Sequence, residues 1–204
     1  GYEQICEFLG TNPDVRISLV FFEDGETKRK VTGHQGNGMA KGTLIVEVYN
    51  QEIKLDPFHE TTHILASEIG HPPAILNEGL ATYMSKWLKT PSNKDREDNS
   101  VSLYEKVREN KAKGNWIPLE ELLAFTEIGS EWSKPLVAYP QAGSFVKFLI
   151  DTYGREKFLE AYSRLDNSKE EIVFKQNREN LEQIYGKSLD TLSQEWLKAM
   201  GLPA

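Results

Sequence analysis

Two histidines separated by three residues are the strongest chemical signal in this sequence. Residues 59–63 read His-Glu-Thr-Thr-His, the pattern His-Glu-x-x-His. Residues four apart in an α-helix lie about 40° apart around its axis, so the two imidazoles can face one divalent ion. Glu60 projects about 100° away from His59, which suits a carboxylate that holds a water molecule at that ion. We therefore expect His59 and His63 to be metal ligands and Glu60 to be a general base.

A second segment supplies a third metal ligand. Catalytic zinc usually has three protein ligands and one open position. Residues 76–81 read Leu-Asn-Glu-Gly-Leu-Ala, and Glu78 lies opposite the apolar stripe of the helix predicted there. A short turn with Gly70, Pro72 and Pro73 would bring this helix back beside the first. On periodicity alone Glu78 would more often be an ordinary surface carboxylate, and the preceding motif is what favours a zinc ligand.

The elements around these residues predict an α+β fold. Apolar and β-branched residues indicate strands over 15–22 and 42–49, with 28–31 also extended and 33–38 a loop. Asp56 and Pro57 predict the start of a helix that ends at Gly70. We expect an N-terminal part, 1–90, in which a small mixed or antiparallel sheet packs on the zinc-binding helices, and a helical part, 91–204, that completes the cleft. The other predicted helices are 2–9, 73–88, 101–113, 119–125, 140–153, 156–165, one ending at 185, and 189–200, with a surface loop over 90–99.

Charge and composition exclude several classes of function. The chain has 24 Lys and Arg against 31 Asp and Glu, a net charge of −7, which argues against nucleic acid as a partner. Lys28, Arg29 and Lys30 are adjacent, but neighbouring acids predict a solvated turn. No apolar run approaches the roughly 20 residues of a membrane-spanning helix. A single cysteine, Cys6, rules out an intrachain disulfide, and the start at Gly1 favours an exported protein with its leader removed over a cytoplasmic one.

The two motifs together resemble the gluzincin zinc metallopeptidases, particularly small peptidase-MA-like domains, and the second is similar to that of zinc aminopeptidases. The resemblance implies a zincin-like fold, Zn²⁺ bound by His59, His63 and Glu78, and Glu60 as the base. Residues 137–145, Val-Ala-Tyr-Pro-Gln-Ala-Gly-Ser-Phe, resemble a segment that carries a tyrosine which stabilises the tetrahedral intermediate. The resemblance thus implies a catalytic role for Tyr139, while a packing role beside a helix-starting proline is the alternative.

The sequence departs from the aminopeptidases in three respects. The fourteen residues between His63 and Glu78 are fewer than the larger aminopeptidases have. Ser85 stands where those enzymes often have an acid behind the metal ligands. Residues 36–40 read Gly-Asn-Gly-Met-Ala, which does not match the Gly-x-Met-Glu-Asn signature that binds a free amino terminus. Aminopeptidase specificity is therefore not implied. If the strand at 42–49 lies at the sheet edge, it can pair with an extended peptide by main-chain hydrogen bonds.

The sequence thus predicts a zinc-dependent metallopeptidase that hydrolyses peptide bonds with water activated by Glu60. The substrate would be a peptide or protein. The alternative is a catalytically silent or latent protein that binds zinc or peptide in the same place. The sequence does not decide the oligomeric state, the cleavage preference or the choice between endopeptidase and exopeptidase.

Overall fold

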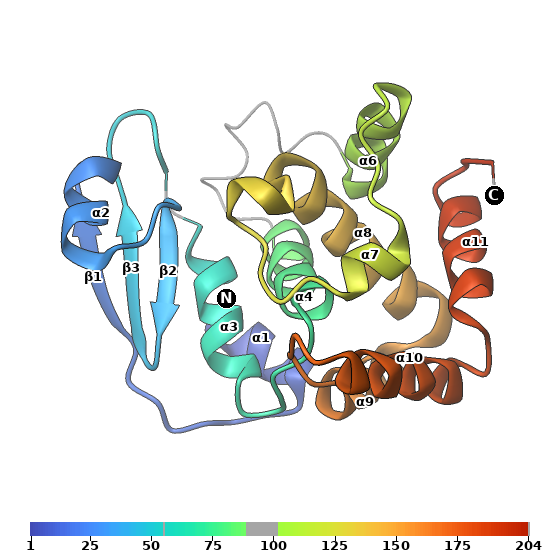
Figure 1. Ribbon diagram of the computed structural model, residues 1–204. Coiled ribbons are helices and arrows are strands. Elements are labelled where there is room, and N and C mark those ends of the chain that lie inside the picture. The colour runs from blue at the N-terminus through green and yellow to red at the C-terminus, as the bar shows by residue number, and fades with distance from the viewer. Residues whose placement is uncertain (55, 89–101, 204) are drawn as a thin grey trace. The chain divides into compact units, whose positions relative to one another are not determined.

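The computed structural model describes residues 1–54, 56–88 and 102–203 (Figure 1). The chain divides into two compact units. One unit comprises Gly1–Glu68 and Met84–Ser100, and the other comprises Ile69–Tyr83 and Val101–Ala204. Helices predominate and the strands belong to one small sheet, so the described chain is α+β as predicted. The predicted loop at 90–99 and the predicted helix start at residue 101 lie outside the described residues.

The sheet of the first unit has the strand within residues 42–49 at its centre. Its strands are β1 (Ser18–Phe22), β2 (Gly38–Lys41) and β3 (Leu44–Val48), in the order β1-β3-β2. β3 pairs parallel with β1, with Val20 opposite Val46, and antiparallel with β2. The condition that the strand at 42–49 lies at the sheet edge is not met, because β3 has a neighbour on each side. β2, which begins in the segment predicted to be a loop, occupies that edge.

A helix replaces the turn and extended segment predicted over residues 23–31. Helix α2 (Gly25–Thr32) begins after Asp24, whose side chain accepts hydrogen bonds from the Thr27 amide at 2.7 Å and the Thr27 hydroxyl at 2.9 Å. This capping satisfies an amide that the first helical turn would otherwise leave unpaired. The prediction of a solvated basic cluster was wrong for Lys28, which is 0% exposed.

Two further helices complete the described core of this unit. Helix α1 (Tyr2–Leu9) ends at Gly10 in the left-handed conformation, as predicted, and packs against α3 (Pro57–Ala66). Helix α3 also packs against β2 and begins after Asp56, again as predicted. It ends at Ala66, short of the predicted Gly70, and Ser67 donates a hydrogen bond back to the Ile64 carbonyl at 2.7 Å.

The second unit is a helical assembly around α8 (Pro135–Tyr153). Trp196 is fully buried there, with its ring 5.2 Å from that of Phe145 and its indole N–H donating to the Ser144 hydroxyl at 3.2 Å. The buried ring of Trp196 thus packs in the core while its polar N–H group keeps a hydrogen-bond partner. The helices are the Ala74–Tyr83 part of α4 (Ala74–Trp87), α6 (Leu103–Ala112), α7 (Leu119–Leu123), a 3₁₀ turn η2 (Glu131–Ser133), α8 (Pro135–Tyr153), α9 (Arg155–Arg164), α10 (Glu171–Tyr185) and α11 (Leu189–Ala199).

Helix α8 begins earlier than predicted and contains a proline. Its first residue is Pro135, whereas the sequence predicted a start at Pro140. A proline inside a helix leaves the carbonyl four residues earlier without its usual donor. That carbonyl belongs to Leu136, and the Asn110 side-chain amide donates to it at 3.1 Å. The helix therefore continues through Pro140 with a substitute partner from α6.

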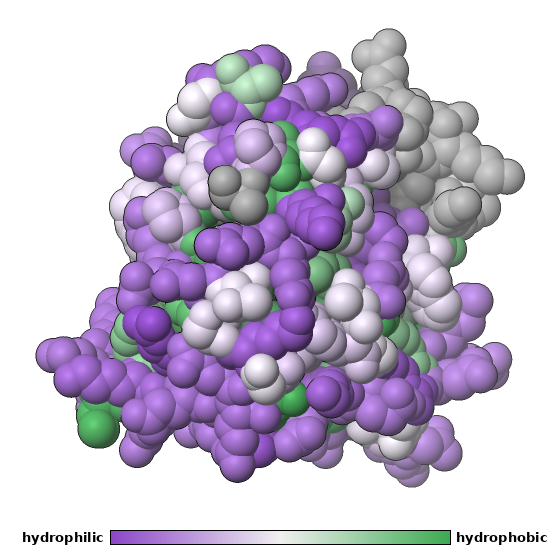
Figure 2. Space-filling view, turned by 90° about the vertical axis from the view of Figure 1, so that its right-hand side faces the viewer, coloured by the Kyte–Doolittle hydropathy of each residue, from purple (hydrophilic) through white to green (hydrophobic). Residues whose placement is uncertain are grey.

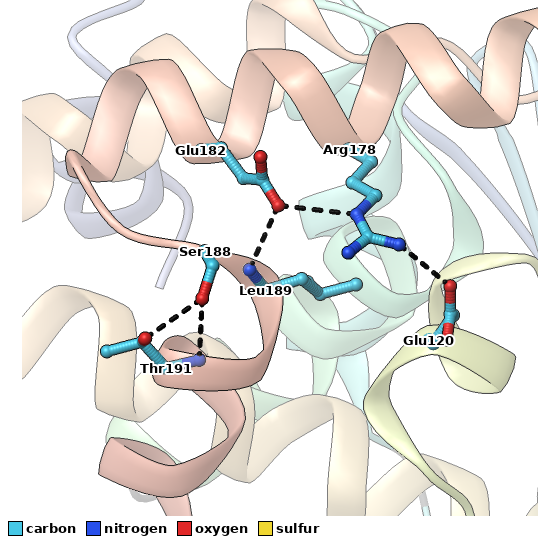
Figure 3. A network of polar contacts seen from close by, with 6 residues as sticks. All are labelled: Glu120, Arg178, Glu182, Ser188, Leu189 and Thr191. Carbon is cyan, nitrogen blue, oxygen red and sulfur yellow. Dashed lines mark hydrogen bonds and ion pairs between the residues drawn. The ribbon is translucent and has the colours of Figure 1, made fainter.

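Polar contacts join α7, α10 and α11 on the surface of this unit (Figure 3). Arg178 contacts Glu120 at 3.0 Å and Glu182 at 3.3 Å, and Glu182 also accepts from the Leu189 amide at 3.2 Å. Ser188 caps α11 through the Thr191 amide. The face shown in Figure 2 is largely hydrophilic. No helix among the described residues is long and apolar enough to span a membrane.

Candidate metal centre

The two histidines of the motif face each other on α3. Their Nε2 atoms are 3.3 Å apart, and the ring centroids are 4.9 Å apart at an interplanar angle of 79°. Both side chains are half-buried. Two imidazole nitrogens held this close present neighbouring lone pairs to one point, which is how a helical His-x-x-x-His pair binds a metal.

The opposite side of α3 fixes the helix so that these rings keep their direction. Leu65 is 0% exposed and Thr62 is 1% exposed, and the Thr62 hydroxyl donates to the Phe58 carbonyl at 2.6 Å. Helix α3 packs against α1 and β2, so a rotation of the helix about its axis would lose packing contacts. The buried side chains of Thr62 and Leu65 thus help to anchor the helix.

Glu60 lies against the start of β2. Its residue exposure is 9%, and a Cβ added to Gly38 would lie 2.5 Å from Glu60 Oε1 and 3.2 Å from Glu60 Cδ. Any side chain at position 38 would therefore displace this carboxylate. The glycine-rich segment, which the sequence suggested was only a loop, has a specific steric role beside the predicted base.

Glu78 lies on the second-unit part of α4 and is half-buried. Asn77, beside it, accepts a hydrogen bond at 2.8 Å from the Tyr162 hydroxyl, and Tyr162 is 1% exposed. Burial raises the pKa of Tyr162 above its ordinary value, and the negative charge of Glu78 raises it further. Tyr162 therefore remains a neutral hydrogen-bond donor that holds this turn of α4.

Close packing against α8 also positions this turn. A Cβ added to Gly79 would lie 2.6 Å from the Ala142 carbonyl oxygen and 2.6 Å from a methyl group of Val146. Within the second unit, the helix that Gly79 contacts is α8.

The three predicted metal ligands form a group. One ligand atom from each of His59, His63 and Glu78 lies within 4.8 Å of those of the other two, and all three residues are half-buried. No other group of three or more His, Cys, Asp or Glu residues in the described parts of the chain meets this criterion. Two imidazole nitrogens and one carboxylate oxygen fit zinc, whereas Mg²⁺ and Ca²⁺ prefer oxygen ligands throughout. The donor set therefore fits the ion that the sequence motif implies.

Tyr139 has a defined hydrogen bond in the second unit. It lies in the first half of α8, and its hydroxyl donates to the Ile128 carbonyl at 2.9 Å. A tyrosine hydroxyl has one proton, so this bond occupies its donor. The catalytic role implied for Tyr139 stays a prediction.

The sequence reasoning missed several residues that support the candidate ligands. Ser85 donates a hydrogen bond to Asp56, the residue before α3. An acid therefore lies beside position 85, although position 85 itself is a serine. Asp56 Oδ1 is buried with no hydrogen-bond partner among the described residues. Asn77, a polar residue in the second motif, could have indicated a hydrogen bond that positions α4. Its partner Tyr162 lies 85 residues later, and no local pattern indicated it.

Comparison of the chain with protein-family models, with curated proteins and with solved structures gave no match.

Proposed function

We propose that this protein is a zinc-dependent peptidase of the gluzincin type, with a zincin-like arrangement of its sheet and metal-binding helices. His59, His63 and Glu78 would hold the ion. The observation that carries the proposal is the convergence of their ligand atoms within 4.8 Å, in a chain whose motif places a glutamate next to the first histidine. When bound, zinc would supply Lewis acidity toward a peptide carbonyl and toward a water molecule.

Glu60 is the general base of the proposed reaction. Its carboxylate accepts a proton from water while the water oxygen forms a bond to the peptide carbonyl carbon. The same proton then passes to the amide nitrogen as the C–N bond breaks and the amine leaves. Packing of Glu60 against Gly38 supports this role because it limits the directions that the carboxylate can take.

β2 is the strand best suited to bind an extended substrate. Among the described strands it has one neighbour, β3, and it packs against α3, which carries Glu60. A peptide that adds to this edge would be held by main-chain hydrogen bonds and would need little side-chain specificity. The proposal therefore favours cleavage within extended, flexible segments of a peptide or protein.

Tyr139 is retained as a candidate for stabilising the oxyanion. Its hydroxyl would have to leave the Ile128 carbonyl before it could donate to substrate, because it has only one proton. A Tyr139→Phe variant that keeps full turnover would remove this residue from the mechanism.

The direct test is Glu60→Gln, measured for zinc content and for cleavage of a broad peptide library by mass spectrometry. We expect zinc retention at about one ion per chain and a loss of turnover of roughly 10²–10⁴-fold, the usual contribution of a general base. Glu68→Gln is the matched control, because Glu68 follows α3 and is exposed. Unchanged turnover in Glu60→Gln would refute the proposed base.

The same experiment tests the alternative function. If the wild-type protein binds zinc and peptides but cleaves none, it is a peptidase-like binding protein. If cleavage appears only after limited truncation, the enzyme is latent.

A further inference from the structure

Lys28 is an unusual residue for its helix. Its exposure is 0%, although neighbouring Lys30 on α2 is exposed and pairs with Glu26 at 2.7 Å. Lysine is rarely buried without partners, because removing its ammonium group from water costs free energy. Burial lowers the pKa of Lys28, and the charge of Glu60 opposes that effect, so the two groups interact electrostatically.

The partners of Lys28 lie on the segment that leads into β2. Its Nζ donates to the Gly36 carbonyl at 2.7 Å and is 3.1 Å from His34 Nδ1. The Thr32 hydroxyl donates to the Lys28 carbonyl at 2.8 Å and accepts from the His34 amide at 3.1 Å. The side chain of Lys28 is therefore bonded directly to the segment between α2 and β2, and its backbone carbonyl is linked to that segment through the Thr32 hydroxyl.

This segment ends at the glycine that touches Glu60. Gly36, bonded to Lys28, is two residues before Gly38, where an added Cβ would lie 2.5 Å from Glu60 Oε1. The position of the Gly38 backbone thus determines the space that the Glu60 carboxylate can occupy. A shift of the 34–38 segment would change that space.

We propose that Lys28 is a positioning residue for the peptidase reaction: its side chain holds residues 34–36 so that the start of β2 keeps the Glu60 carboxylate in its productive orientation. This inference rests on the proposed function. It concerns a residue that belongs neither to the ligand set nor to the motif. Either protonation form of the lysine can donate to the Gly36 carbonyl, so the proposed role depends on the hydrogen bonds.

Two variants separate positioning from folding. Lys28→Met keeps an unbranched side chain of similar length but removes the donor. Gly38→Ala leaves Lys28 intact and places a methyl group against Glu60, at a position whose φ is outside the left-handed region, so the backbone accepts alanine. Lys30→Met is the matched control for loss of a lysine from α2.

Each variant is compared with the wild type by kcat and KM on one cleaved peptide, by zinc stoichiometry, and by hydrogen exchange of residues 33–41. We expect a fall in kcat of about 10–100-fold, the scale for a catalytic group misplaced by about 1 Å, in Lys28→Met and Gly38→Ala. KM should stay within about twofold and zinc stoichiometry should not change. Exchange over 33–41 should be faster in Lys28→Met than in Lys30→Met.

Three outcomes would overturn the inference. One is unchanged kcat per folded molecule in Lys28→Met, even if the protein melts at a lower temperature, because that marks a purely structural lysine. A second is unchanged exchange over 33–41. The third is a wild-type protein that binds zinc but cleaves no peptide, which also overturns the proposed function, whereas the first two leave that function standing.

Discussion

Replacement of Gly79 by alanine should weaken both the second unit and the metal site. Gly79 is next to Glu78 on α4, and an added Cβ would lie 2.6 Å from both the Ala142 carbonyl oxygen and a Val146 methyl group. Overpacking of this kind costs roughly 1–3 kcal/mol, and the higher helix propensity of alanine offsets about 1 kcal/mol. The difference is a net loss of roughly 0–2 kcal/mol in the free energy of unfolding, and we expect the upper half of that range because the Ala142 oxygen belongs to the backbone of α8 and cannot rotate away.

The displacement should also reach the metal ligand. Residues that support a metal ligand typically change metal affinity 10–100-fold when altered, and we expect Gly79→Ala to bind zinc about tenfold more weakly. The assays are urea denaturation of metal-free protein, followed by circular dichroism, and competition for zinc with a chromophoric chelator.

Gly25→Ala is the control for this prediction. Gly25 is also helical, but an added Cβ there meets nothing within 4 Å. The control should be no less stable than the wild type and should bind zinc equally well. If Gly79→Ala behaves like Gly25→Ala in both assays, the account of how α8 positions the Glu78 turn is wrong.

Two further substitutions test individual contacts of the second unit. Tyr162→Phe removes the hydrogen bond to Asn77 and should cost about 1 kcal/mol in the free energy of unfolding; no measurable change in urea denaturation would contradict the role of this bond. Hydrogen bonds from Lys187 and then from Tyr153 lower the pKa of Glu195, so the stabilisation is present above the ordinary glutamate pKa and is lost as the pH falls through the lowered value. Glu195→Gln should therefore melt below the wild type at neutral pH and match it in strong acid, and a melting-temperature difference that does not shrink on acidification would refute this linkage.

Local signals in the sequence predicted several element boundaries well. Gly10 ends α1 and Gly186 ends α10, both in the left-handed conformation that glycine adopts without strain. Asp56 and Pro57 gave the start of α3. These signals work because capping depends on residues that are close in sequence.

Boundaries that depend on distant residues were predicted less well. Helix α8 continues through Pro140 because Asn110, 26 residues before Leu136, supplies a donor to the Leu136 carbonyl. β2 is a strand because β3 offers it a pairing partner, although its own residues, which start with a glycine, have weak strand propensity. For α2, the capping signal of Asp24 was present but the charged residues around it were interpreted as a turn.

The candidate site also has features that local sequence predicted and features that it did not. Helical periodicity was sufficient to place His59 and His63 on one face, since four residues make slightly more than one turn. The contact of Glu60 with Gly38 and the burial of Lys28 come from packing between elements, which no local pattern encodes. The spacing thus predicted the chemical groups, and the fold supplies the residues that hold them.

X-ray absorption at the zinc edge of the purified protein is the most direct test of the central claim. The account predicts about one zinc per chain, with two imidazole ligands at roughly 2.0–2.1 Å, further oxygen ligands and no sulfur. Glu78→Gln should weaken zinc binding, whereas His71→Ala, at a histidine outside the ligand group, should not. A protein that binds no zinc, or binds it without imidazole ligands, would contradict the account.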